Sequence, residues 1–267
     1  KKIIWSDVPQ NTVYEWSEAG GTKVYLHPSG NTTTDSTLEG ANGLLLDQNG
    51  NLILCQHGDR RIAMMEAPVS APASQFQTLA ATYEGQRFNS PNDAAFGPGD
   101  NLYFTDPPYG LKKLEEDPAK ELPYQGVFRL APDRKLVLLV DSLTKPNGIA
   151  FSPDQSTCYV ANSDPDKAIW MAYKVDENHN FSEGKLFFDA TAWVPDRPGL
   201  PDGMKVHPNG TIFATGPGGV LVFSPAGKHL GTIETGTAIA NCAFDSNYEY
   251  LYMTADMYMT RIKLGAR

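Results

Sequence analysis

Residues 42–54 have the sequence NGLLLDQNGNLIL, and the same arrangement returns four more times along the chain. The counterparts are NDAAFGPGDNLYF at 92–104, NGIAFSPDQSTCY at 147–159, DGMKVHPNGTIF at 202–213 and NCAFDSNYEYLY at 241–252. Each copy has a polar residue, a short apolar run, a turn and a second apolar run. Turn pairs such as Asn49-Gly50 and Asn209-Gly210 favour tight β-hairpins. The copies begin 50, 55, 55 and 39 residues apart, which is the spacing of β-propeller blades.

Two further strand-like runs follow each pair, for example 126–130 with 136–140 and 219–223 with 229–233. Four short strands in each unit, without long helical periodicity, are typical of a propeller. We therefore predict an all-β fold, a single six-bladed β-propeller over residues 1–267 with a central channel. The predicted blades are a partial first blade at 1–40, four blades at 41–86, 87–144, 145–198 and 199–237, and a partial sixth blade at 238–267.

The two partial blades each have only three strand-like runs. The first blade has second, third and fourth strands at 3–7, 12–16 and 23–26, and so lacks its inner strand. The sixth blade ends at 259–264 without an outer strand. A single segment of about 20–40 residues before Lys1 would supply both strands, judged from the length of one blade. We expect the natural protein to have this segment, and we expect 22 blade strands from the residues given.

Composition excludes several kinds of partner. The net charge is −9, and no basic stripe is present, so a nucleic acid or an anionic membrane surface is not expected as a partner. No run reaches eighteen apolar residues, which predicts no membrane span. Cys55, Cys158 and Cys242 each lie in an apolar strand-like run, and we expect them to be buried free thiols. The oligomeric state and the compartment, cytoplasm or periplasm, stay open.

Polar residues recur where the strands of each blade begin and end. The second strand of a blade returns antiparallel to the first, so the start of the first and the loop after the second share a face. The strand starts on this face are Asn42, Asn92, Asn147, Asp202 and Asn241, and the loop residues are Asp7, His57, Asp106, Asn162 and Gly216. Converging amide and carboxylate oxygens suit a hard cation such as Ca²⁺. For Asn42 and Asn241, capping of the blade alone is an equally good interpretation.

Other hydrolytic chemistries lack their motifs. The chain has no HExxH or CxxC spacing and no GxSxG nucleophile elbow, which disfavours a zinc protease site and a serine hydrolase. His57 is the only histidine expected near the mouth of the channel. It is either a substrate or acid–base contact or a structural loop residue.

Several longer segments resemble one protein family. These are RFNSPND at 87–93, YFTDPPYG at 103–110, KPNGIAFSPD at 145–154, LPDGM at 200–204 and NCAF at 241–244. Together they are similar to the senescence marker protein, gluconolactonase and luciferin-regenerating enzyme family, and most similar to its bacterial gluconolactonase branch. The resemblance extends over essentially the whole chain. It implies a six-bladed propeller with one catalytic divalent metal in the channel. We expect Ca²⁺, with Zn²⁺, Mn²⁺, Mg²⁺ and Fe²⁺ left open.

The resemblance also implies roles for individual residues. Asn147 of Pro-Asn-Gly and Asp202 of Pro-Asp-Gly match metal ligands of the family, and Asn92 matches a residue that contacts substrate. Arg87 resembles a substrate-binding arginine, although its spacing to the strand differs here. We add Asp106, His57 and Tyr109 as candidate substrate contacts.

A third family ligand, the glutamate of a Glu-Gly-Pro motif, has no counterpart in this sequence. Glu39-Gly40 precedes the wrong blade, so we expect the ligand in the segment before Lys1. A chain without it should bind metal poorly and have little or no activity.

We therefore predict hydrolysis of a small sugar-type lactone. A divalent metal would polarise the carbonyl and activate a water, and Asp202 would be both ligand and candidate general base. Two alternatives remain open, since propellers serve many functions. One is a metal-dependent organophosphate or aryl-ester hydrolase in the same channel, and the other is a non-catalytic binding propeller. The insertion at 111–124 is either a solvated loop or a lid that influences substrate choice.

Overall fold

The computed structural model describes residues 2–32 and 39–265. The described residues form β-strands and three short 3-10 helices, Pro98–Asp100, Leu114–Glu116 and Thr191–Asp196. They divide into two compact units. The first unit comprises the chain up to residue 96 together with 100–142, and the second comprises 97–99 and the chain from 143 onward.

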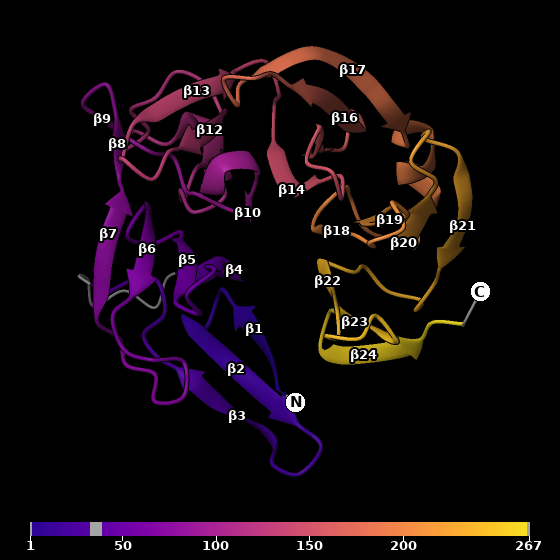
Figure 1. Cartoon of the computed structure of the whole chain (residues 1–267), viewed down its shortest axis with the longest axis horizontal. Helices are drawn as coiled ribbons and strands as arrows, with labels where there is room; N and C mark the ends of the chain where they lie inside the picture. Colours follow the sequence, from indigo (N-terminus) through magenta and orange to yellow (C-terminus); the bar gives the residue numbers. More distant parts are fainter. Residues whose placement is uncertain (1, 33–38, 266–267) are drawn as a thin grey trace. The chain divides into compact units, whose positions relative to one another are not determined.

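The first unit contains three antiparallel sheets and a small hairpin, coloured indigo to magenta in Figure 1. The first sheet is β1 (Ile3–Asp7), β2 (Thr12–Ser17) and β3 (Gly21–Leu26). The second is β4 (Ala41–Leu46), β5 (Leu52–Gln56), β6 (Arg61–Met65) and β7 (Phe76–Ala80). The third is β10 (Ala94–Phe96), β11 (Leu102–Asp106), β12 (Gly126–Leu130) and β13 (Leu136–Val140). The hairpin β8 (Thr82–Tyr83) and β9 (Gln86–Arg87) lies between the second and third sheets in sequence.

The second unit contains three more antiparallel sheets. The first is β14 (Pro146–Phe151), β15 (Thr157–Asp164), β16 (Lys167–Val175) and β17 (Phe181–Asp189). The next is β18 (Met204–Val206), β19 (Ile212–Gly216), β20 (Gly219–Phe223) and β21 (His229–Ile233). The last is β22 (Asn241–Phe244), β23 (Tyr250–Ala255) and β24 (Tyr258–Lys263).

In all six sheets the strands are hydrogen-bonded in chain order, which is the meander of a propeller blade. Within the described ranges, four sheets have four strands, and the first and the last have three. The predicted 22 blade strands are thus confirmed. The hairpin β8–β9 was not predicted, because two-residue strands leave no periodic pattern. The segment expected before Lys1 stays a prediction.

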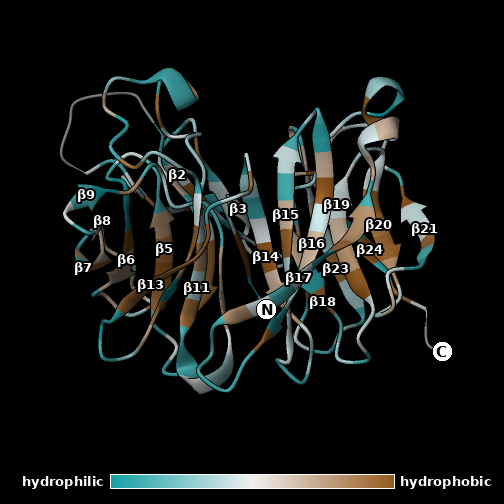
Figure 2. Ribbon diagram, turned by 90° about the horizontal axis from the view of Figure 1, so that it is seen from above, coloured by the Kyte–Doolittle hydropathy of each residue, from teal (hydrophilic) through white to brown (hydrophobic). Residues whose placement is uncertain are grey.

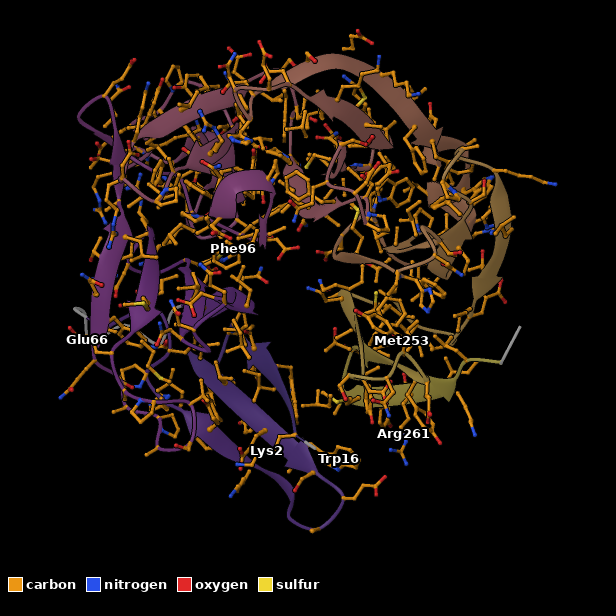
Figure 3. All side chains as sticks on the ribbon, viewed as in Figure 1. Lys2, Trp16, Glu66, Phe96, Met253 and Arg261 are labelled. Atoms are coloured by element: carbon orange, nitrogen blue, oxygen red, sulfur yellow. The ribbon has the colours of Figure 1, made fainter. Side chains whose placement is uncertain are left out.

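The second strands of the sheets lie in the cores. Every residue of β5, β11 and β19 is buried. Leu54 and Cys55 of β5, for example, belong to two different apolar clusters, one on each face of the strand. Figure 2 shows hydrophobic residues concentrated in strands and hydrophilic ones in the loops. Phe96 and Met253, both labelled in Figure 3, belong to two such cores, one in each unit.

Two hairpin turns and the three cysteines agree with the expectations from the sequence. Gly50 and Gly210 have φ of 81° and 86°, a left-handed conformation that glycine adopts without strain. The prediction for the three cysteines is confirmed, because Cys55, Cys158 and Cys242 are all buried and free.

Candidate functional site

The strand starts of the second unit are brought together by glycines. A Cβ added to Gly148 would lie 2.1 Å from the backbone oxygen of Asp202. A Cβ on Gly203 would lie 2.2 Å from Cγ and Oδ1 of Asn241. Only glycine permits backbones to approach this closely. Asn147, Asp202 and Asn241 therefore occupy the starts of three successive sheets. Gly148 packs against Asp202, and Gly203 packs against Asn241.

The first unit repeats this arrangement. The Gly43 N–H donates to the backbone oxygen of Asn92 at 2.7 Å, and a Cβ on Gly43 would lie at the same distance from that oxygen. The Ser6 hydroxyl donates to the backbone oxygen of Asn42 at 2.6 Å. Asn42 and Asn92 are thus neighbours at the starts of successive sheets.

Asn147 and Asp202 differ in exposure. Asn147 is only 4% exposed, and the register of β14 against β15 shifts between Pro146 and Ile149. This irregularity places Asn147 and Gly148 outside regular pairing, as a β-bulge does near functional sites. Asp202 is half-buried, and its backbone N–H donates to the oxygen of Thr215 at 3.1 Å.

Asn162 orders the loop that leads into Asn147. Its Oδ1 accepts the N–H of Lys145 at 2.8 Å, and its Nδ2 donates to the oxygen of Lys167 at 2.8 Å and to the Thr144 hydroxyl at 3.0 Å. Asn162 is completely buried. It therefore acts as an internal brace for the loop at residues 144–147.

Asp106 has the same function in the first unit. It is completely buried, and its two carboxylate oxygens accept the N–H groups of Asn89 and Ser90, both at 2.8 Å. Burial raises the pKa of Asp106 to about 7, although these two backbone hydrogen bonds favour the charged form. The carboxylate thus holds the loop that leads into Asn92. Direct contact of Asp106 with substrate stays a prediction.

The other predicted substrate residues are also in the first unit. Asn92 is 3% exposed, and its backbone N–H donates to Thr105. Tyr109 is half-buried. Arg87 is exposed on β9, where its backbone N–H donates to the Glu121 carboxylate at 2.7 Å.

His57 is buried next to an acidic residue. Its side chain is 3% exposed, and Nδ1 lies 3.8 Å from Oε2 of Glu39. The His57 Nε2 atom has no hydrogen-bond partner among the residues that the structure describes. A buried ring nitrogen in this condition has capacity for a water or a ligand atom.

Sequence reasoning missed Arg60 and Asn89. Arg60 is 5% exposed and Asn89 is completely buried. Both side chains bond to backbone atoms of distant segments. Nothing in the sequence separates the buried Arg60 from its neighbour Arg61, because the difference arises from residues about 30 and 60 positions away.

The donor atoms at the second unit's strand starts suit a hard cation. In the described part of the chain, no three residues of the His, Cys, Asp or Glu type are grouped as a metal site. Asn147 and Asp202 instead offer an amide oxygen and a carboxylate, which are ligands that Ca²⁺ and Mg²⁺ accept together with water. The two residues fit such an ion as part of its ligand shell.

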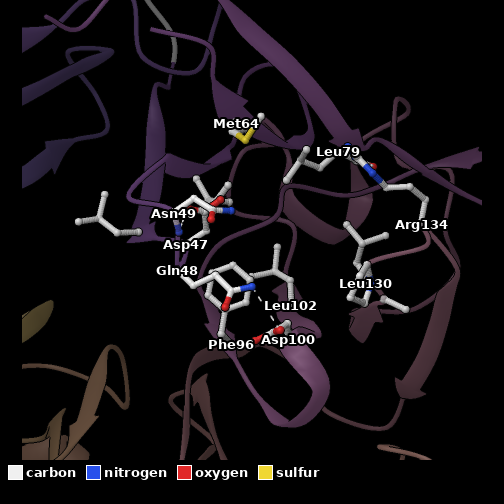
Figure 4. A pocket seen from close by; sticks show the side chains of 14 residues that line it. Asp47, Gln48, Asn49, Met64, Leu79, Phe96, Asp100, Leu102, Leu130 and Arg134 are labelled. Atoms are coloured by element: carbon white, nitrogen blue, oxygen red, sulfur yellow. Dashed lines mark hydrogen bonds between the residues drawn. The ribbon is translucent and has the colours of Figure 1, made fainter. Parts of the chain in front are cut away.

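Two cavities lie away from these residues. The one in the first unit has a volume of about 470 Å³, and Met64, Leu79 and Phe96 contribute to its walls (Figure 4). Its Gln48 side chain donates to Asp100 at 3.3 Å. A second cavity of about 750 Å³ is in the other unit, next to His207 and Tyr248. Neither cavity contains a predicted site residue.

No helix among the described residues is long and apolar enough to span a membrane.

Residues 1–256 match the family described as the SMP-30/Gluconolactonase/LRE-like region, and the chain belongs to this family. It is 36% identical over 277 residues to the gluconolactonase of Zymomonas mobilis, covering 98% of this chain and 74% of that protein.

Among solved structures, a gluconolactonase from Xanthomonas campestris matches with a TM-score of 0.83 and 31% identity, over 99% of this chain and 82% of that one. A luciferin-regenerating enzyme matches in fold with a TM-score of 0.73 at 17% identity, over 95% of this chain and 80% of that one. The predicted fold class, a six-bladed β-propeller, is confirmed.

Proposed function

We propose that this protein hydrolyses a small sugar-type lactone, using a divalent metal held in part by Asn147 and Asp202. The observation that carries the proposal is the contact of Gly148 with the Asp202 backbone, which puts an amide and a carboxylate at adjacent strand starts. Family membership and the names of the similar gluconolactonases support the lactone as substrate.

A divalent cation bound to these oxygens would polarise the lactone carbonyl and lower the pKa of a water. Ca²⁺ is the ion we propose, because both protein ligands are hard oxygen donors. The Asp202 carboxylate, half-exposed at its strand start, accepts the proton of the attacking water as general base. The Asn147 amide is held rigidly by its burial and by the bulge, so its oxygen needs little reorganisation.

The predicted substrate contacts supply recognition in this proposal. Asn92 has an amide that both donates and accepts hydrogen bonds, which suits the hydroxyls of a sugar lactone. His57, Tyr109 and Arg87 are proposed as further contacts. Asp106 supports the loop that leads into Asn92, because its carboxylate accepts the backbone N–H groups of Asn89 and Ser90.

The test is lactone opening by full-length protein, followed in a pH-stat with δ-gluconolactone, a γ-lactone and paraoxon. Asp202→Ala and Asn147→Ala should each abolish metal-dependent opening, while the control Asn209→Ala changes an exposed turn residue and should keep it. Wild-type rates in both site variants would refute the proposed roles. Faster hydrolysis of paraoxon than of either lactone would favour the organophosphatase alternative.

A further inference from the structure

Arg60 joins two segments that are far apart in sequence. Its Nε donates to the backbone oxygens of Phe88 at 2.6 Å and Asn89 at 3.1 Å, and its Nη1 donates to the oxygen of Ala119 at 2.8 Å. Phe88 and Asn89 belong to the loop leading to Asn92, and Ala119 belongs to the insertion at 111–124. One buried guanidinium thus connects a predicted substrate loop to the insertion.

Further hydrogen bonds join the second half of the insertion to residues 86–89. The Arg87 N–H donates to the Glu121 carboxylate at 2.7 Å, and the Gln86 side chain donates to the Glu121 backbone oxygen at 3.0 Å. The Asn89 Nδ2 donates to the oxygen of Tyr124 at 2.9 Å. This half of the insertion therefore lies on the segment that precedes Asn92.

The beginning of the insertion is fixed to the same loop. The Gly110 N–H donates to the Ser90 hydroxyl at 2.8 Å, and that hydroxyl donates to the oxygen of Pro107 at 2.5 Å. Between the two ends, residues 112–116 are exposed to solvent. The insertion is thus an exposed arch whose two ends depend on residues 86–90.

The buried charges of Arg60 and Asp106 favour a positioning role for Arg60. Asn89 lies between two buried charges, since its N–H donates to Asp106 and its backbone oxygen accepts from Arg60. Burial lowers the pKa of Arg60, while the nearby Asp106 carboxylate favours its charged form. The Nη2 atom has no hydrogen-bond partner within the described residues. A buried cation that is incompletely paired is a poor source of stability, but it fixes the position of its partners.

We propose that Arg60 is a positioning residue that holds the insertion at 111–124 on residues 86–90 and thereby determines which lactones are accepted. The inference rests on the proposed lactonase function. Residue 90 is two positions before Asn92, and Tyr109 is two positions before the first residue of the insertion. Movement of the insertion therefore displaces two proposed contacts to sugar hydroxyls. An unsubstituted lactone has no such hydroxyls and does not need these contacts.

The experiment compares Arg60→Ala and Arg60→Lys with the matched control Arg61→Ala. Arg61 donates to Gln56, Thr78, Asp59 and Thr32, and none of these residues belongs to the insertion. Trypsin cleavage at the exposed Lys112 and Lys113 should be roughly 10-fold faster in Arg60→Ala, because charged hydrogen bonds oppose local opening. Arg61→Ala should be cleaved at the wild-type rate, and Arg60→Lys should recover part of the protection.

Steady-state kinetics test the substrate choice. In Arg60→Ala, KM for δ-gluconolactone should rise roughly 10-fold with kcat changed less than about threefold, since uniform binding is lost. The kcat/KM for γ-butyrolactone should stay at the wild-type value. Glu121→Ala removes an exposed carboxylate that accepts the Arg87 N–H and favours the charged form of Arg60. It should shift both measurements in the same direction, which keeps the test valid if Arg60→Ala does not fold.

Unchanged cleavage in Arg60→Ala and Glu121→Ala would overturn the positioning role. Faster cleavage with an unchanged KM for δ-gluconolactone would overturn the link to substrate choice. If the wild-type protein opens neither lactone, the proposed function fails, and the cleavage rates still decide whether Arg60 holds the arch.

Discussion

The contact between Gly148 and Asp202 leads to the most specific prediction. In Gly148→Ala the new Cβ would lie 2.1 Å from the Asp202 backbone oxygen and 2.9 Å from its carbonyl carbon, whereas ordinary contacts begin at 3.4 Å. The obstructing atoms are backbone atoms, so the strand starts must separate by about 1 Å. Overpacking of this kind costs about 1–3 kcal/mol of stability. A displacement of about 1 Å at a reacting centre costs about 10²-fold in rate.

The assay is kcat/KM for δ-gluconolactone together with a thermal melt of the same sample. Gly148→Ala should stay folded with a lowered Tm and lose about 100-fold in kcat/KM. In Gly203→Ala the clash is with the Asn241 side chain, which can rotate, so the loss should be smaller. Gly231→Ala is the control, because its Cβ would meet nothing within 4 Å. A folded Gly148→Ala with wild-type kcat/KM would show that the spacing of Asn147 and Asp202 does not matter.

Two further predictions concern the buried braces. Burial raises the pKa of Asp106 from an ordinary 3.8 to about 7. Between these two pH values the unfolded chain releases the Asp106 proton while the native state keeps it. The free energy of unfolding therefore has its full value below about pH 4 and decreases as the pH rises to 7. In urea melts between pH 4 and 7, the wild type should lose up to about 4 kcal/mol relative to Asp106→Asn, and parallel pH profiles would contradict this. Asn162→Ala removes the hydrogen-bond partner of the Lys145 N–H and of the Lys167 oxygen, which belong to a half-buried and an exposed residue. It should cost about 0.5–1.5 kcal/mol for each lost hydrogen bond and speed hydrogen exchange at residues 144–147, and an unchanged exchange rate would argue against the brace.

The repeat in the sequence was sufficient to predict the sheets, because it consists of local signals. Apolar runs separated by Asn-Gly turns specify hairpins wherever they occur. The same repeat placed an Asn or Asp at each strand start, and the structure shows the glycines after Asn147 and Asp202 packed against the next start. Even the three-stranded first and last sheets followed from counting these runs.

The supporting residues could not be predicted, since their roles depend on distant partners. The sequence predicts Asp106 as a substrate contact, which stays a prediction, but it does not reveal that both carboxylate oxygens bond to a loop 16 and 17 residues earlier. Arg60 and Arg61 look equivalent, yet only Arg60 reaches the insertion, 59 residues away. Which member of such a pair becomes buried is decided by the packing of the whole unit.

The most direct test of the account is lactone opening by full-length protein before and after chelation of divalent cations. Chelation should abolish the opening of δ-gluconolactone, and added Ca²⁺ should restore it in the wild type but not in Asp202→Asn. Full activity of the chelated wild type, or equal restoration in Asp202→Asn, would contradict a lactonase that depends on a metal at Asn147 and Asp202.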